Sequence, residues 1–310
     1  MTSGGGEPRR WCAEHSADRL DQYVATVTGV SRSQVQRLIR AGAVLVNGEV
    51  ARPSAAVRTG DEIEARLPTA ADDVIRPEPV PLRVVYESAD VIVVDKPAGI
   101  LVHPAGNVRS GTLVNAILYH YPEVATVGPV GRQGVVHRLD KDTSGLLIFA
   151  RSSNGLRLMQ EQFRKHEVAK TYLALLVGEL NPAAGVIDAP VGRHPFERQR
   201  MAVVRQGGRP ARTQYRVLEV FPGYCYVQAH PLTGRTHQLR VHFAAVGHPV
   251  AGDPVYGDGR GELGLKRQFL HAHALQFRDP GGAMVAVQSP LPEDLSEVLS
   301  SLRSSSAGEG

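Results

Sequence analysis

The sequence has few of the features that would mark a secreted, membrane-spanning or disulfide-stabilised chain. Its 310 residues include only two cysteines, Cys12 and Cys225, which are far apart and form no Cys-x-x-Cys pair. Neither a disulfide framework nor a zinc knuckle is therefore expected. No run of 18 apolar residues is present, and the polar, glycine-rich start lacks the apolar centre of a signal peptide. These absences favour a cytoplasmic protein without a membrane span.

Glycine-rich cofactor loops are also missing. No Gly-x-Gly-x-x-Gly follows a predicted strand, and no Gly-x4-Gly-Lys-Ser/Thr occurs, so neither a dinucleotide site nor a P-loop is supported. His271 and His273 alternate in "FLHAHAL" and could supply half of a metal site, but no third ligand accompanies them. We expect neither a cofactor nor a bound metal.

Lysine is scarce, since only five of the 35 basic residues are lysines. The planar guanidinium of arginine fits phosphate groups better than a lysine amine does. A general compositional bias would explain the same excess of arginine over lysine. Two segments concentrate the arginines, and the net charge of the whole chain is only +4. They comprise Arg32, Arg37, Arg40, Arg52 and Arg58, and then Arg193, Arg198, Arg200, Arg205, Arg209, Arg212 and Arg216. Two separate basic segments favour a polyanionic partner, with ordinary solvated surface as the alternative.

The patterning predicts two folded units of the α+β class. Residues 1–14 read as a disordered tail, and residues 15–67 as two short helices with a small sheet. A proline-rich linker is expected over 68–81, and a larger unit of many strands and a few helices over 82–302. Residues 303–310 read as a polar tail. Strands and helices mix without regular βαβ alternation, which argues against a doubly wound fold.

The stretch "GVVHRLDKDTSGLLIFA" places five titratable side chains at a turn between apolar segments. Each buried charge there needs water, a partner or a ligand. A second stretch, "LTGRTHQLRVHFAAVGHPVAGDPVYG", supplies partners, because Arg240 borders an apolar helix face made by Leu239 and Phe243. We expect the Arg240 guanidinium to meet Asp140 in a cleft and to hold that carboxylate ionised. Asp95, Asp253 and Asp258 are rival acids, but each lies beside proline or glycine in a turn.

The first unit resembles the S4-like RNA-binding domain. The resemblance is carried by "SRSQVQRLIRAGAVLVNG" and the later "GDEI". It implies that the second helix and the following turn contact structured RNA. Arg32, Arg37 and Arg40 lie off the apolar face of that helix and are the RNA contacts we expect there.

The larger unit resembles the RluA/RluD-type pseudouridine synthases. "YESADVIVVDKPAGILVHP", the HRLD stretch, "KTYLALLVG", "VGRHPFERQRMAV" and "LTGRTHQLRVHF" occur in the family's order. The resemblance implies a mixed, largely antiparallel sheet flanked by helices, and isomerisation of uridine to pseudouridine. The RluD branch modifies large-subunit (23S) ribosomal RNA, so RNA is the expected partner of a chain that we expect to be a monomer.

The resemblance also implies roles for single residues. Asp140 would be the nucleophile, attacking uridine C6 or ribose C1′, and Arg240 would pair with it. Tyr172 would lie against the uracil and could handle the C5 proton. Arg138 would take the place of the flipped-out base or hold its phosphate. The remaining RNA contacts that we expect are His137, Arg193, Arg198, Arg235 and His237.

Two other functions remain open at this point. A non-catalytic RNA-binding or ribosome-assembly protein could keep the same fold, although the intact Asp140, Tyr172 and Arg240 argue against it. A hydrolase or base-excising enzyme could use the same aspartate. Isomerisation leaves the mass of the RNA unchanged, whereas excision removes a base, so the products distinguish the two reactions.

Overall fold

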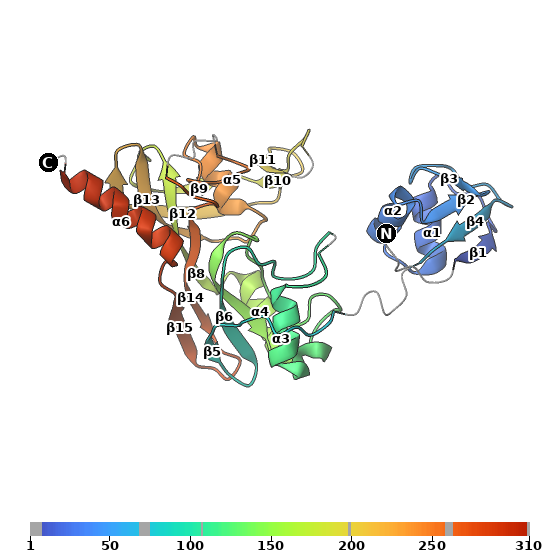
Figure 1. Ribbon diagram of the computed structural model, residues 1–310, viewed down its shortest axis with the longest axis horizontal. Helices are drawn as coiled ribbons and strands as arrows, with labels where there is room; N and C mark the ends of the chain where they lie inside the picture. The colour runs from blue at the N-terminus through green and yellow to red at the C-terminus, as the bar shows by residue number, and fades with distance from the viewer. Residues whose placement is uncertain (1–7, 68–74, 107, 198–199, 258–262, 309–310) are drawn as a thin grey trace. The chain divides into compact units, whose positions relative to one another are not determined.

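The computed structural model divides the chain into two compact units, Met1–Val74 and Ile75–Gly310 (Figure 1). It describes residues 8–67, 75–106, 108–197, 200–257 and 263–308. Two units were expected, and the α+β class is confirmed in both.

Two amphipathic helices and a four-stranded sheet form the first unit. Leu20, Val24, Val35 and Ile39 repeat at helical spacing and are fully buried between the helices and the sheet. The helices are α1 (Leu20–Thr28) and α2 (Arg32–Arg40). In sheet order the strands are β1 (Arg9–Cys12), β4 (Glu62–Ala65), β2 (Val44–Val46) and β3 (Glu49–Val50). The Asn47-Gly48 turn joins β2 to β3, and both residues have the positive φ that this tight turn requires.

The boundaries expected from the sequence need three corrections. Arg9–Cys12 are not part of a tail, because they pair antiparallel with β4 and Arg10 bonds Glu64. Ile75 is buried among core residues of the second unit, so the expected linker over 68–81 is too long at its end. The expected tail from 303 belongs, through residue 308, to helix α6 (Glu293–Gly308). Serines in that helix bond the carbonyl four residues earlier, which satisfies their hydroxyl groups within the helix.

A buried aspartate holds the two helices of the first unit together. The Asp21 side chain is 0% exposed and accepts bonds from Arg19, Arg32 and Gln36. The bond from Arg19 is the main reason that the pKa of Asp21 lies well below its usual range. Arg32, which we expected to contact RNA, therefore also has a structural role between α1 and α2.

We predict that Asp21→Asn destabilises the first unit by about 1–3 kcal/mol at pH 7, because its buried donors lose their charged acceptor. A depressed carboxyl pKa adds stability above the unfolded pKa, so the difference from wild type should shrink as pH falls below about 4. Trp11, the only tryptophan of the chain, lies in β1 and reports this unit in a denaturant titration followed by fluorescence. The exposed Asp18→Asn is the matched control. Equal midpoints for Asp21→Asn and wild type would contradict the prediction.

The second unit is built on a nine-stranded mixed sheet with the order β5-β6-β7-β14-β8-β13-β12-β9, in which β15 also pairs with β14. Only the pairing of β7 with β14 is parallel among the described strands, so the sheet is largely antiparallel as expected. Its strands are β5 (Val84–Glu87), β6 (Val91–Lys96), β7 (Ser144–Ala150), β8 (Ala169–Val177), β9 (Ala184–Asp188), β12 (Arg212–Phe221), β13 (Tyr224–Pro231), β14 (Leu270–Arg278) and β15 (Met284–Gln288).

Strand β7 lies at the centre of the sheet and is buried along its whole length. Gly145 has a φ of 110°, and a Cβ there would come within 2.3 Å of the Ala272 carbonyl oxygen on β14. Only glycine permits this close approach of the two strands. The charged stretch that precedes β7 is therefore fixed to the middle of the sheet.

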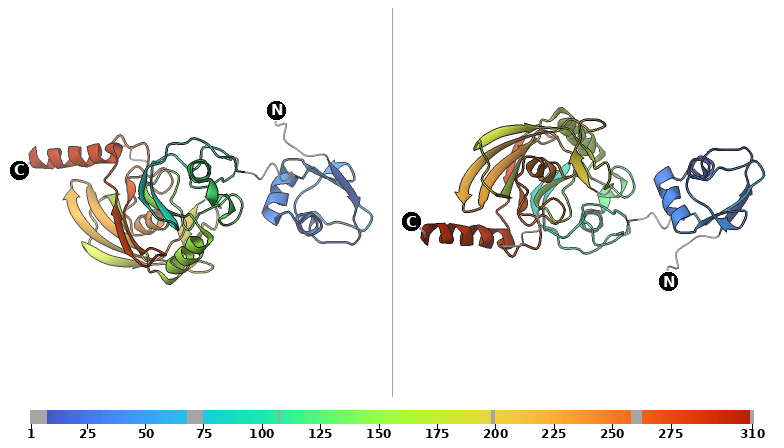
Figure 2. Two further views of the ribbon diagram at one scale, coloured as in Figure 1. Left: turned by 90° about the horizontal axis from the view of Figure 1, so that it is seen from below. Right: turned by 90° about the horizontal axis from the view of Figure 1, so that it is seen from above.

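The helices of the second unit are α3 (Leu113–His120), α4 (Ser153–Lys165), α5 (Gln238–Ala245) and α6, with a short 3-10 turn at Pro122–Thr126. A separate hairpin, β10 (Val191–Arg193) with β11 (Met201–Val203), lies against α5 (Figure 1). Helix α6 runs beside β12 (Figure 2). The Arg303 guanidinium on α6 donates to the Glu219 carboxylate on β12. No helix within the described ranges is long and apolar enough to cross a membrane.

Candidate active site

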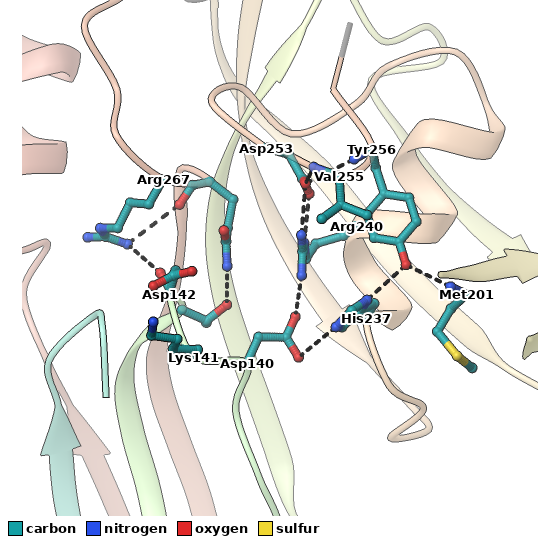
Figure 3. A network of polar contacts seen from close by, with 12 residues as sticks. Asp140, Lys141, Asp142, Met201, His237, Arg240, Asp253, Val255, Tyr256 and Arg267 are labelled. Atoms are coloured by element: carbon teal, nitrogen blue, oxygen red, sulfur yellow. Dashed lines mark hydrogen bonds and ion pairs between the residues drawn. The ribbon is translucent and has the colours of Figure 1, made fainter. Parts of the chain in front are cut away.

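The charged stretch before β7 and the start of α5 meet at a cavity of about 500 Å³. Asp140, Tyr172 and Arg240, which the sequence predicted to act together, all line it, although they come from a loop, a strand and a helix. Figure 3 shows Asp140 pointing toward Arg240 on α5 and toward His237, the residue just before that helix.

A buried lysine holds the loop that carries Asp140. The Lys96 amine is fully buried at the end of β6 and donates to the carbonyls of Pro97, Ile100 and Lys141, at 2.7–2.9 Å. Burial lowers the pKa of this amine to about 7. Because Lys141 follows Asp140 directly, the three bonds fix the backbone beside the carboxylate.

His137 supports the same loop from the other side. Its Nε2 accepts the backbone N–H of Ile148 at 2.9 Å, and its ring stacks on Phe163 with centroids 4.5 Å apart. Burial lowers the pKa of His137 to about 3, so the ring is neutral and orders the loop next to the cavity. The resemblance implied RNA contact for His137, and this structural task was not foreseen.

Arg240 joins two carboxylates. Its Nη1 donates to Asp140 Oδ2 at 3.0 Å, while Nε and Nη2 donate to Asp253 at 2.7 and 2.8 Å. The Asp253 side chain is fully buried, and the exposed fractions of Arg240 and Asp140 are 5% and 17%. Burial alone would lower the pKa of the guanidinium, but the two carboxylates raise it well above its usual value. The expected pairing of Asp140 with Arg240 is present, and Asp253 is a second partner that we did not expect.

Asp253 is held by backbone N–H groups and so keeps Arg240 in position. Its Oδ1 also accepts the backbone N–H groups of Val255 and Tyr256, at 2.9 and 3.0 Å. These bonds and Arg240 outweigh the effect of burial and keep the pKa of Asp253 below its usual range. With four N–H donors on its carboxylate, Asp253 is a supporting acid, as its turn position indicated.

His237 and Tyr256 lie on the open side of Asp140. His237 Nε2 is 3.8 Å from Asp140 Oδ1, and its Nδ1 is 2.8 Å from the Tyr256 hydroxyl. Burial lowers the pKa of His237, more than the nearby Asp140 raises it, so the imidazole is neutral near pH 7. Asp140 therefore has one bonded cation, Arg240, and one oxygen with no donor closer than this histidine among the described contacts.

Tyr172 and Lys170 line the same cavity from β8. Burial, with a smaller effect of Asp140, raises the pKa of the Tyr172 phenol well above its usual value. Burial lowers the pKa of Lys170 to about 8. The phenol is therefore protonated at neutral pH, and the lysine is close to losing its charge.

The other predicted contacts are scattered. Arg138 is exposed at the cavity rim, and Arg235 also lines the cavity while its Nε donates to the Pro210 carbonyl. Arg193 is exposed at the end of β10, and Arg37 and Arg40 are exposed on α2 in the first unit. Arg198 lies outside the described residues.

Three residues of the site were missed by sequence reasoning, namely Lys96, Lys170 and Tyr256, and Asp253 was considered only as a rival acid. Lys170 and Tyr256 stand inside stretches already singled out, next to Tyr172 and Asp253, which was the available signal. Nothing local to Lys96 indicates that its amine is enclosed by backbone carbonyls.

The side chains that line the cavity define the chemistry that this site can perform. Within the described ranges, no three His, Cys, Asp or Glu side chains lie together in a way that could hold an ion. A partly exposed carboxylate beside a fixed guanidinium and a protonated phenol can act as a nucleophile or as a hydrogen-bond acceptor for a bound ligand.

Comparisons with known proteins identify the family of each unit. The RNA pseudouridylate synthase family model matches residues 90–245, and the S4 domain model matches residues 18–63. A solved structure, human RNA pseudouridylate synthase domain containing 1, is 30% identical with a TM-score of 0.57 and covers 73% of this chain and 96% of its own.

Curated relatives cover nearly the whole chain. An uncharacterized RNA pseudouridine synthase of Chloroflexus aurantiacus is 47% identical over 93% of this chain and 91% of its own length. Ribosomal large subunit pseudouridine synthase D of Xanthomonas campestris is 42% identical over 89% of this chain and 86% of its own. The chain therefore belongs to the RNA pseudouridine synthases of the RluA/RluD type and is an isomerase with an S4 RNA-binding domain in front.

Proposed function

We propose that this enzyme isomerises uridine in large-subunit ribosomal RNA, with Asp140 as the nucleophile on a flipped-out base. The substrate follows the names of the relatives called ribosomal large subunit pseudouridine synthase D. Ribosomal RNA as substrate and a site complete within one chain lead us to propose a cytoplasmic monomer.

The observation that carries the proposal is that Arg240 makes two hydrogen bonds to Asp253, through two of its three nitrogens, but only one to Asp140, through the third. Asp140 is thereby oriented, and it keeps a partly exposed oxygen on the cavity side. One carboxylate suffices for an isomerase, because no water has to be activated, in contrast to the paired acids of glycosidases. Attack on C6 and attack on C1′ both fit this geometry.

Tyr172 and Arg138 complete the proposed arrangement. The raised pKa of Tyr172 means that its phenol is protonated when the base enters, so it packs against the uracil as a ring and a hydrogen-bond donor. It can accept the C5 proton only after its own proton has left. Arg138 is exposed at the rim, where it can replace the flipped base in the RNA stack.

The reaction is tested with ribosomal RNA that carries tritium at C5 of uridine. Because the base is rejoined through C5, one tritium should be released to water for each modified site, in excess EDTA and without an added cofactor. Free uracil in amounts that match the tritium would instead favour base excision. Tritium that stays on the RNA, or a need for a metal or nucleotide, would rule the proposal out.

The nucleophile is tested with Asp140→Asn, and Asp142→Asn two residues on is the matched control. We expect Asp140→Asn to abolish tritium release and to leave RNA affinity within several-fold, because phosphate contacts dominate affinity. Asp142 does not line the cavity, so its variant should retain turnover. Measurable turnover by Asp140→Asn would remove the assignment.

The lowered pKa of Lys170 predicts a pH-dependent RNA contact. The cation is present below about pH 8 and is lost above it, instead of persisting to the usual pH of a lysine. If this cation meets one phosphate, the slope of log affinity against log salt should become shallower by about one between pH 7 and pH 9.5. Lys170→Arg should keep the steeper slope at both pH values. Identical slopes of wild type at the two pH values would show that Lys170 meets no phosphate.

A further inference from the structure

The hairpin of β10 and β11 presents an unusual aromatic side chain. Phe196, in the turn between the two strands, is 89% exposed, more than any other large hydrophobic residue of the described chain. A phenyl ring so fully in water contributes nothing to the core. A single exposed hydrophobic residue is common on protein surfaces, so the argument for a ligand depends on what surrounds Phe196.

The turn around Phe196 is braced by its own side chains. His194 Nδ1 accepts the backbone N–H groups of Phe196 and Glu197, at 3.4 and 3.0 Å. The Arg200 guanidinium donates to the Glu197 carboxylate at 3.2 Å. The backbone N–H of His194 donates to the backbone carbonyl of Arg200. These contacts fix the backbone on both sides of Phe196 among the residues that the structure describes, and such order lowers the entropy cost of binding.

The base of the hairpin is attached to the catalytic residues. The backbone N–H of Met201 donates to the Tyr256 hydroxyl at 3.0 Å, and the Arg200 guanidinium lies 5.5 Å from the centre of the Tyr256 ring. Tyr256 in turn contacts His237 beside Asp140 (Figure 3). An RNA whose uridine enters the cavity therefore passes close to this hairpin.

We propose that Phe196 is a stacking surface for a nucleobase of the substrate RNA, outside the catalytic cavity. The arginines Arg193, Arg205 and Arg209 are exposed around the same hairpin and supply charge for the phosphates on either side of that base. Aromatic rings and arginines together are what an unpaired RNA strand needs, and any base can stack on a phenyl ring. This basic environment favours RNA over a protein partner.

The test measures the dissociation constant for protein-free large-subunit ribosomal RNA. Phe196→Ala should weaken binding about tenfold, whereas Phe196→Trp should bind as wild type or more tightly, because stacking needs a ring. Met284→Ala, an exposed apolar residue on β15, is the control and should change nothing. In a Trp11→Phe background, the fluorescence of the Phe196→Trp variant should be quenched by the RNA.

Binding within twofold of wild type for Phe196→Ala would overturn the proposal. Unquenched fluorescence would do the same. A loss seen only with assembling subunits, and not with protein-free RNA, would assign Phe196 to a protein contact instead.

A second inference rests on the hydroxyl of Tyr256. Met201 N–H can only donate, so the hydroxyl oxygen is its acceptor, and the single hydroxyl hydrogen remains for His237 Nδ1. The proton of the neutral His237 ring then lies on Nε2, the nitrogen 3.8 Å from Asp140 Oδ1. In the opposite tautomer, with the proton on Nδ1, the Tyr256 hydroxyl oxygen would accept from both Met201 and His237. The hydroxyl hydrogen would then need another acceptor.

The geometry assigns Tyr256 as a positioning residue, which fixes the His237 tautomer so that an N–H group points at Asp140. This inference rests on the proposed role of Asp140. Tyr256→Phe keeps the ring beside Arg240, whose guanidinium carbon lies 5.1 Å from its centre, and removes only the hydroxyl. We expect kcat to fall about tenfold with KM within twofold of wild type, because the loss concerns orientation of the nucleophile.

Nitrogen NMR of the histidine ring separates the two claims. The Nε2–H form of His237 should dominate in the wild type and lose its dominance in Tyr256→Phe, whatever Asp140 does. An Nδ1–H form in the wild type, or an unchanged kcat in Tyr256→Phe, would overturn the role of Tyr256. Turnover by Asp140→Asn would overturn the role of Asp140 and leave the tautomer result standing.

Discussion

One guanidinium between two carboxylates is the interaction on which the active site depends. Arg240 is held bidentately by Asp253, and its remaining nitrogen reaches Asp140. If the cation were absent, two acids would face each other in a poorly solvated region, where like charges are costly. Leu239 and Phe243, one residue before and three after Arg240, pack the α5 helix into the core and so set where the cation stands.

The groups around Asp140 are mostly driven to their neutral forms. Burial lowers the pKa values of His137 and His237 and raises that of Tyr172. Arginine resists this effect because its intrinsic pKa is so high, and Arg240 keeps its charge. Since Asp253 already takes two of the Arg240 donors, the negative charge of Asp140 is oriented but only partly compensated. That is a suitable state for a carboxylate proposed to attack an electrophilic carbon.

The high intrinsic pKa of arginine also offers a physical reason for the scarcity of lysine. Two of the five lysines, Lys96 and Lys170, are enclosed, and burial brings their pKa values to about 7 and 8. Arg19 is bound to Asp21 in the first unit and Arg240 to Asp140 in the second, and these carboxylates raise the pKa of both guanidinium groups, which keep their charge. A guanidinium can also bond a carboxylate with one edge and leave other donors for phosphate. Arg32 combines such a structural bond with a place on the helix that we expect to face RNA.

The sequence alone determined the parts of the structure that local chemistry encodes. Asn47-Gly48 required a tight turn, and the spacing of Leu239 and Phe243 required a helix with Arg240 at the edge of its apolar face. The HRLD stretch and its companion motifs identified the family and made Asp140 the candidate nucleophile. Their order along the chain was sufficient for this, because the family's motifs are local in sequence.

Tertiary structure alone decided which distant groups share the cavity. Asp140 and Arg240 are 100 residues apart, and the sequence does not show that Arg240 bonds two carboxylates at once. The second acid, Asp253, looked like an ordinary turn residue, and the amine of Lys96 had no local sign of its three carbonyl partners. Strand β1 could not be foreseen either, because Arg9–Cys12 form a strand only by pairing with β4, more than fifty residues later in the chain. Such contacts depend on which surfaces folding brings together, and local patterns of polarity do not carry that information.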